Sequence, residues 1–161
     1  MISSAPRAVS LSAFICALAL CHGAGAAPVF AVNQPWVAPT AGRKTTEAYM
    51  DLTSSEAVVL VAARSDAAAK VTLRGPPGTK PEARELALPA HVTVSLAPHT
   101  YRLALTGIGA PLKRGDRVAL TLTIRHESGV LQDIPVNAEV RLHSPLDDER
   151  RAHRHAHWPA H

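Results

Sequence analysis

The chain has 161 residues, of which 47% are hydrophobic but only 4% aromatic, and its formal net charge is +4. This length suits one domain with a core of mainly aliphatic side chains. The basic residues are scattered and not interleaved with aromatic residues, which argues against a nucleic-acid-binding protein. The sequence has no G-x-S-x-G elbow, no H-E-x-x-H pair and no paired carboxylates, so we do not expect an enzyme.

Residues 1–26 are typical of a secretory signal peptide. Arg7 supplies the positive charge, Ala8–Leu20 is an apolar run, and Ala24-Gly25-Ala26 provides small residues for cleavage after Ala26. The apolar run is short for a membrane span, so we expect cleavage, with a retained membrane anchor as the alternative. The mature protein is then periplasmic, without a stable membrane anchor.

Both cysteines of the chain lie within this signal segment. Leu20 stands immediately before Cys21, where a lipoprotein signal needs a small residue, so we do not expect lipidation. The other cysteine, Cys16, is removed with the same peptide. The mature protein therefore has no disulfide and no thiolate metal ligand.

The mature chain contains short apolar runs separated by turn-forming residues, which predicts eight or nine β-strands. The expected strands span Val29–Trp36, Thr45–Thr53, Ala57–Ala63, Lys70–Leu73, Glu82–Leu88, His91–Leu96, Tyr101–Thr106, Arg117–Ile124 and Val130–Val140. Only Ser65–Ala69 suggests a helical turn. Because the runs do not repeat in sequence, this pattern predicts an all-β antiparallel sandwich or barrel and not a solenoid or propeller.

The clearest strand pattern is that of Arg117–Ile124. Its apolar residues Val118, Leu120, Leu122 and Ile124 recur at every second position, so they share one face of a strand and should point into the core. The last expected strand contains Pro135, which predicts an edge strand or a bulge.

Residues 144–161 differ in composition from the rest, being charged and rich in histidine, and predict a disordered tail. His153, His155 and His157 would project to one side of an extended chain, and His161 follows. Imidazole suits copper(II) and zinc, so the tail is a candidate metal site. Arginines between the histidines repel cations, and a solvated basic tail with incidental histidines is equally consistent with the sequence.

Several segments resemble the PCu(A)C family of periplasmic copper chaperones. These are Ala48-Tyr49-Met50 after Trp36, the segment from Pro98 to Leu105, and the Pro111–Asp116 loop that leads into Leu120–Ile124. The resemblance extends from about Val29 to Val140. It implies a cupredoxin-like Greek-key β-sandwich over residues 27–143. It also implies copper traffic towards a receiving protein, such as an oxidase assembly factor.

The resemblance also implies where copper(I) should bind, because the family uses two histidines and two methionines, a soft ligand set. In this chain the histidine positions match Arg74 and Arg102, and one methionine position matches Ala104. The hairpin that would carry the second methionine has none, and Met50 is expected in the core. An arginine cannot ligate a cation and repels it.

Two further histidines, His91 and His99, are candidates for a relocated site, although two imidazoles alone make a poor one. We therefore expect a divergent copper-traffic protein that handles any metal with its C-terminal histidines. The alternative is a metal-free binding module that presents Arg74 and Arg102 to an anionic or protein partner.

Overall fold

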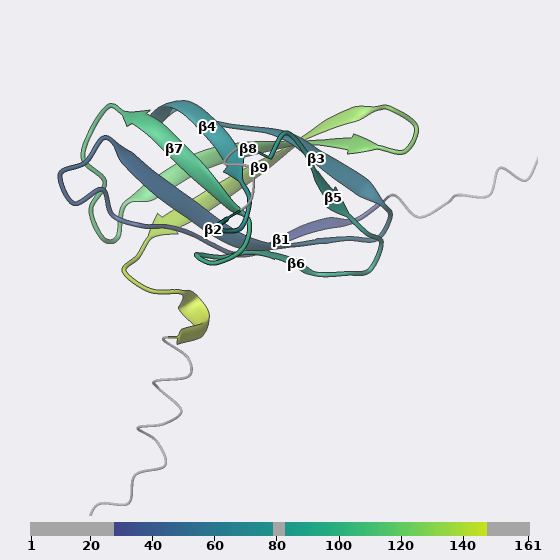
Figure 1. Cartoon of the computed structure of the whole chain (residues 1–161), viewed down its shortest axis with the longest axis horizontal. Coiled ribbons are helices and arrows are strands. Elements are labelled where there is room, and N and C mark those ends of the chain that lie inside the picture. Colours follow the sequence, from purple (N-terminus) through teal and green to yellow (C-terminus); the bar gives the residue numbers. More distant parts are fainter. Residues whose placement is uncertain (1–27, 79–82, 148–161) are drawn as a thin grey trace, which may run out of the picture.

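A computed structural model describes residues 28–78 and 83–147, which form nine strands (Figure 1). The expected signal peptide and the four histidines of the tail lie outside these residues, so the signal peptide and the tail metal site both stay predictions. The strands are β1 (Phe30–Val37), β2 (Thr45–Ser54), β3 (Val58–Ser65), β4 (Ala68–Arg74), β5 (Leu86–Leu88), β6 (Val94–Leu96), β7 (Arg102–Ile108), β8 (Arg117–His126) and β9 (Leu131–Val140). The all-β prediction is confirmed.

The strands form one curled sheet in the order β4-β7-β2-β1-β9-β8-β3-β5, with β6 paired to β2. All ladders are antiparallel except the short one between β1 and β9, which joins Trp36 and Val37 to Glu139 and Val140. The curl brings β4 beside β3, but the two strands share no ladder within the described residues. A cavity of about 250 Å³ lies between them. The sheet is therefore a partly open barrel.

The expected helical turn at Ser65–Ala69 is wrong. Ser65 ends β3, residues 66–67 form a turn, and β4 begins at Ala68. Ser65 Oγ accepts a hydrogen bond from Ala67 N (3.3 Å) and donates one to Ala119 O (2.7 Å). These bonds, with the ladder from β4 to β7, outweigh the helix propensity of the alanines.

The strand expected at His91–Leu96 is shorter in the structure, where β6 begins at Val94. His91 has a φ of 61°, in the left-handed region, and its backbone N donates to Ser54 O (2.7 Å). This conformation interrupts an extended strand.

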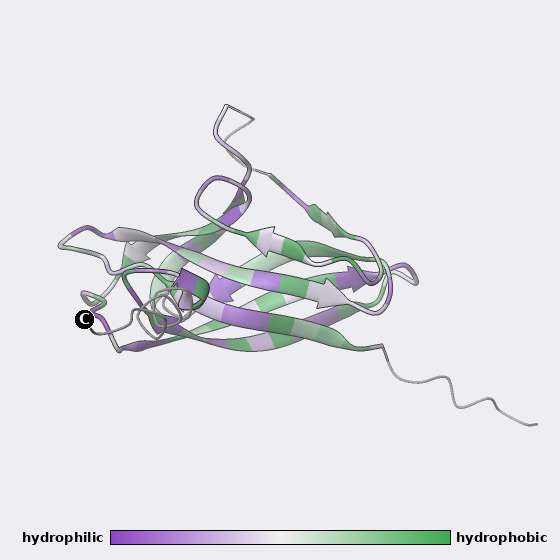
Figure 2. Ribbon diagram, turned by 90° about the horizontal axis from the view of Figure 1, so that it is seen from below, coloured by the Kyte–Doolittle hydropathy of each residue, from purple (hydrophilic) through white to green (hydrophobic). Residues whose placement is uncertain are grey.

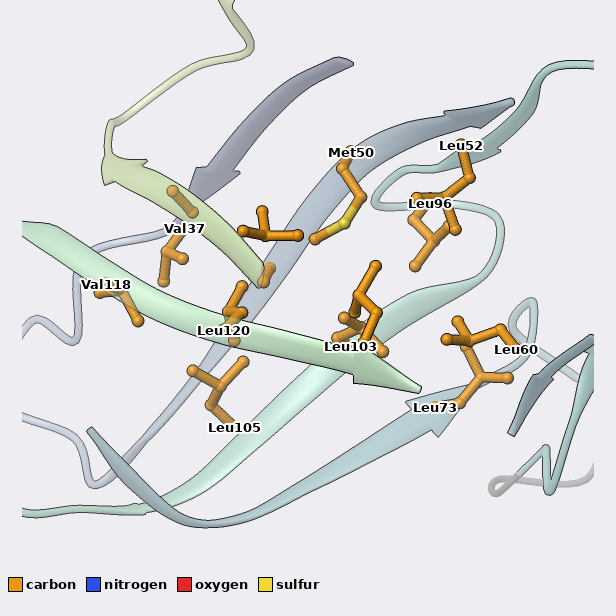
Figure 3. Close-up of a cluster of buried hydrophobic side chains, with 14 of the residues drawn as sticks. Val37, Met50, Leu52, Leu60, Leu73, Leu96, Leu103, Leu105, Val118 and Leu120 are labelled. Atoms are coloured by element: carbon orange, nitrogen blue, oxygen red, sulfur yellow. The ribbon is translucent and has the colours of Figure 1, made fainter. Parts of the chain in front are cut away.

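The core confirms the two-residue period of β8. Val118, Leu120, Leu122 and Ile124 are at most 2% exposed. They pack with side chains from the facing strands, including Met50 and Leu103, as Figure 3 shows. Along the strands, hydrophobic residues alternate with hydrophilic ones (Figure 2). Met50 is itself only 2% exposed, so it is a core residue, as expected.

Pro135 lies where β9 is an edge strand. It pairs with Thr121 of β8, but β1 reaches β9 only at Glu139 and Val140. The unpaired side of β9 therefore tolerates the missing N–H group.

After β9 the chain makes a helical turn over residues 145–147. Ser144 caps it, because its Oγ accepts from Leu146 N (3.3 Å) and its carbonyl accepts from Asp147 N (3.0 Å). Pro145 suits the first helical position. Within residues 28–78 and 83–147, no helix is long and apolar enough to cross a membrane.

Gly107 in β7 should not tolerate a side chain. Its φ is +70°, and an added Cβ would lie 2.7 Å from the Cβ of Ala69. We expect Gly107→Ala to lower the free energy of unfolding by about 1–3 kcal/mol. Gly109→Ala is the matched control, because nothing lies within 4 Å of its added Cβ. Urea unfolding of both variants measures the difference, and equal midpoints would contradict this reading of Gly107.

Candidate functional site

The two arginines that the resemblance matches to histidine positions face each other across neighbouring strands. Arg74, the last residue of β4, is the register partner of Arg102, the first residue of β7. Ala104 follows two residues later and therefore lies on the same face of β7 as Arg102. Because directly opposed residues have Cβ atoms about 5 Å apart, the three positions converge on one small area of the sheet.

Arg102 of β7 is held in this area by contacts to β2 and to the residue that follows β4. Its Nε donates to Glu47 Oε1 of β2 (2.7 Å), and its Nη1 donates to the carbonyl of Gly75 (3.0 Å). Its side chain is only 18% exposed. The charge of Arg102 is therefore matched within the domain, and this side chain is not offered to an external anion. Arg74 has no ion pair among the described residues, so the anionic-partner hypothesis now depends on Arg74.

Tyr49 completes this network on β2. Its hydroxyl donates to Glu47 Oε2 (2.6 Å). The centroid of its ring lies 4.5 Å from the centroid of the Trp36 ring, and the two ring planes are tilted by 36°. Burial is the largest cause that raises the pKa of Tyr49 far above its usual range; the hydrogen bond and charge of Glu47 add to it, and Arg102 opposes it. The phenol therefore stays protonated and serves as a donor.

The structure does not bring His91 and His99 together. They flank β6, one before its start and one beyond its end, and His91 is held at Ser54 by its backbone. In the part of the chain that the structure describes, no three His, Cys, Asp or Glu side chains form a group that could hold a metal ion. His153, His155, His157 and His161 lie outside the described residues, so the tail site stays a prediction.

His126 has a partner that the sequence did not suggest. Nδ1 of His126 contacts the carboxylate of Glu56, which lies just before β3. Nε2 lies 2.8 Å from Gln132 Oε1 of β9. The hydrogen bond to Glu56, then that to Gln132, raises the pKa of His126. His126 therefore links the turn between β2 and β3 to β8 and β9.

This contact should make stability depend on pH. Because the folded pKa of His126 is raised, its contribution is complete below the ordinary histidine pKa of about 6.5 and is lost as pH rises through the folded value. We expect the unfolding free energy of the native chain to fall from pH 6 to pH 9 relative to His126→Gln. Denaturant titrations at several pH values measure this. His99→Gln serves as the control for loss of an imidazole, and an identical slope in both variants would contradict the assignment to His126.

Comparison with known proteins places this fold. The family described as "Putative lipoprotein LpqE-like" matches residues 30–136. No curated protein matches the chain. Among solved structures, the apo PCuAC domain from PmoF1 is similar, with 23% identity and a TM-score of 0.60 over 70% of this chain and 92% of that one.

Two copper-bound structures are also similar. The copper-bound PCuAC domain from PmoF2 has 20% identity and a TM-score of 0.58, over 70% of this chain and 92% of that one. CuI-DR1885 from Deinococcus radiodurans has 26% identity and a TM-score of 0.50, over 71% of this chain and 76% of that one. These likenesses confirm the cupredoxin-like β-barrel fold that the resemblance implied. The chain therefore belongs to the LpqE-like family, and its domain is of the PCu(A)C type.

Proposed function

We propose that this protein is a non-enzymatic, extracytoplasmic copper-traffic protein that carries metal on its C-terminal histidines instead of at the family's domain site. One observation supports the claim that metal is not carried at the family's domain site. Arg74 and Arg102, which the resemblance matches to two histidines of the family, are register partners, and Arg102 is engaged by Glu47. The area holds a matched ion pair and a further cation, so it disfavours a metal cation.

The tail supplies the ligands that this area lacks. His153, His155 and His157 alternate along the chain, and His161 is close enough in sequence to join them around one ion. Imidazole favours copper(II) or zinc over copper(I). In this proposal the signal peptide of residues 1–26 is removed in the periplasm. The mature protein then passes copper to a receiving protein, such as an oxidase assembly factor.

Calorimetry with copper(II) and with zinc tests this proposal. We expect the mature chain to bind at pH 7.5 and to lose binding below about pH 6, as the histidines protonate. A chain ending at Asp147 should not bind. The full-length variant with His153, His155, His157 and His161 changed to Gln controls for other effects of truncation and should also fail. Equal binding by the mature and truncated chains would refute the assignment to the tail.

A second candidate function rests on a hollow of about 520 Å³ beside Arg74. Arg43, Thr45 and Thr106 also line it, together with Glu47, whose carboxylate is paired with Arg102. Two arginines and several hydroxyls suit an anionic group on a protein partner. Capture of a periplasmic partner by the immobilised mature chain in EDTA should be lost in Arg43→Gln/Arg74→Gln. Capture should persist in Lys113→Gln/Arg114→Gln. Loss of capture in both variants would contradict binding of the partner at this hollow.

A further inference from the structure

A third, smaller cavity is lined in part by the C-terminal helical turn. Its volume is about 170 Å³. Trp36 and Tyr49 line it, together with Asp51 of β2 and its register partner Ser95 of β6. Leu146 of the helical turn closes the other side. The chain beyond Asp147 therefore starts at the rim of this cavity.

The cavity presents hydrogen-bond acceptors that lack donors. Gln34 Oε1 is buried and has no hydrogen-bond partner among the described residues. The backbone of Gln34 adopts a left-handed φ of 49° at a register shift between β1 and β2, and this bulge places its side chain at the cavity. Asp51 also lines the cavity, and its carboxylate has no ion pair or side-chain hydrogen bond in the described part of the chain. A buried acceptor without a donor is energetically costly, so this site favours a donor.

The size and walls of the cavity select a particular donor. Pockets for whole ligands are usually larger, about 300–1,000 Å³, so this one suits a single side chain. A guanidinium has five N–H donors in a plane and stacks on aromatic rings, which matches two oxygen acceptors beside Trp36 and Tyr49. Its positive charge also complements the carboxylate of Asp51.

The tail carries such side chains within reach. Arg150 and Arg151 follow Asp147 by three and four residues. An extended chain spans about 3.4 Å per residue, so their backbones lie within roughly 10–14 Å of the last described residue. We propose that one guanidinium of the Arg150–Arg151 pair folds back into this cavity and contacts Gln34 and Asp51. The docked arginine anchors the base of the tail on the domain, independently of any metal.

Side-chain NMR of the metal-free protein in EDTA tests this docking. We expect the Trp36 indole N–H and the Gln34 amide resonances of the mature chain to differ from those of a chain ending at Asp147. Full-length Arg150→Gln/Arg151→Gln should match the truncated chain. His153→Gln/His155→Gln should match the mature chain, because this matched control changes the same tail without removing an arginine. Trp158→Phe assigns the two indole signals.

A titration then identifies the ligand chemistry. N-acetyl-arginine amide should bind the truncated chain at this cavity, and more weakly the mature chain, whose own arginine competes. Asp51→Asn should weaken that binding by about tenfold or more, the value of one hydrogen bond to a charged group. Identical Trp36 and Gln34 resonances in the mature and truncated chains would overturn the proposal, even if the free probe binds. Because no metal is present, failure here leaves the calorimetric test of metal capture unaffected.

Discussion

Restoring the family's ligands should turn the domain into a copper(I)-binding protein. The variant carries Arg74→His, Arg102→His and Ala104→Met in a chain ending at Asp147. Arg74 and Arg102 are register partners, and Ala104 lies on the same face, so the new side chains can reach one ion. Changes outside the ligand shell alone alter metal affinity 10–100-fold, so three new ligands should raise copper(I) affinity by at least about a thousandfold. Competition with a chromophoric copper(I) chelator measures this.

A matched variant separates ligation from the loss of arginine. Arg74→Gln, Arg102→Gln and Ala104→Leu remove the same charges and add similar volume without strong ligands. Both variants lose the bond from Arg102 to Glu47, so both should be destabilised, by about 1–3 kcal/mol. If the His/Met variant binds copper(I) no better than this control, the three positions do not form the family's site in this chain.

The largest expected loss of stability comes from the centre of β8. Leu122 is fully buried, and we expect Leu122→Ala to lower the free energy of unfolding by about 3–4 kcal/mol, through lost burial and the cavity left behind. Leu131→Ala, the same substitution at a side chain that is 60% exposed, should change it by less than about 0.5 kcal/mol. Urea titrations followed by circular dichroism compare the two. Equal losses would show that β8 does not carry the core.

Local patterns in the sequence were enough to find the strands. The two-residue period of β8 reflects burial of one face, which the order of residues records directly. The turn at residues 66–67 was missed, because alanine favours helix locally and only pairing with β7 makes this segment a strand. Likewise, the left-handed conformation of His91 accompanies a hydrogen bond to Ser54, which lies in β2.

The contacts within the candidate site could not be predicted from the sequence, because they join residues that are far apart along the chain. The resemblance located Arg74, Arg102 and Ala104, but not the ion pair that engages Arg102. Glu47 lies 55 residues before Arg102, and the pairing of β2 with β7 brings them together. His126 and Glu56 are 70 residues apart. Neither pair has a signature in a single sequence, because opposite charges occur throughout the chain and register selects the partner.

The short parallel ladder between β1 and β9 has a consequence for the folding of a growing chain. It joins Trp36 to Glu139, so the first strand meets one of its two neighbours only when the last strand is present. A chain that emerges from its N-terminus onward must keep this edge of β1 unpaired until β9 is available. Such non-local pairing slows folding to the range of milliseconds to seconds. The incomplete chain therefore passes through an interval in which it is vulnerable to proteases and aggregation, and which ends when its last strand arrives.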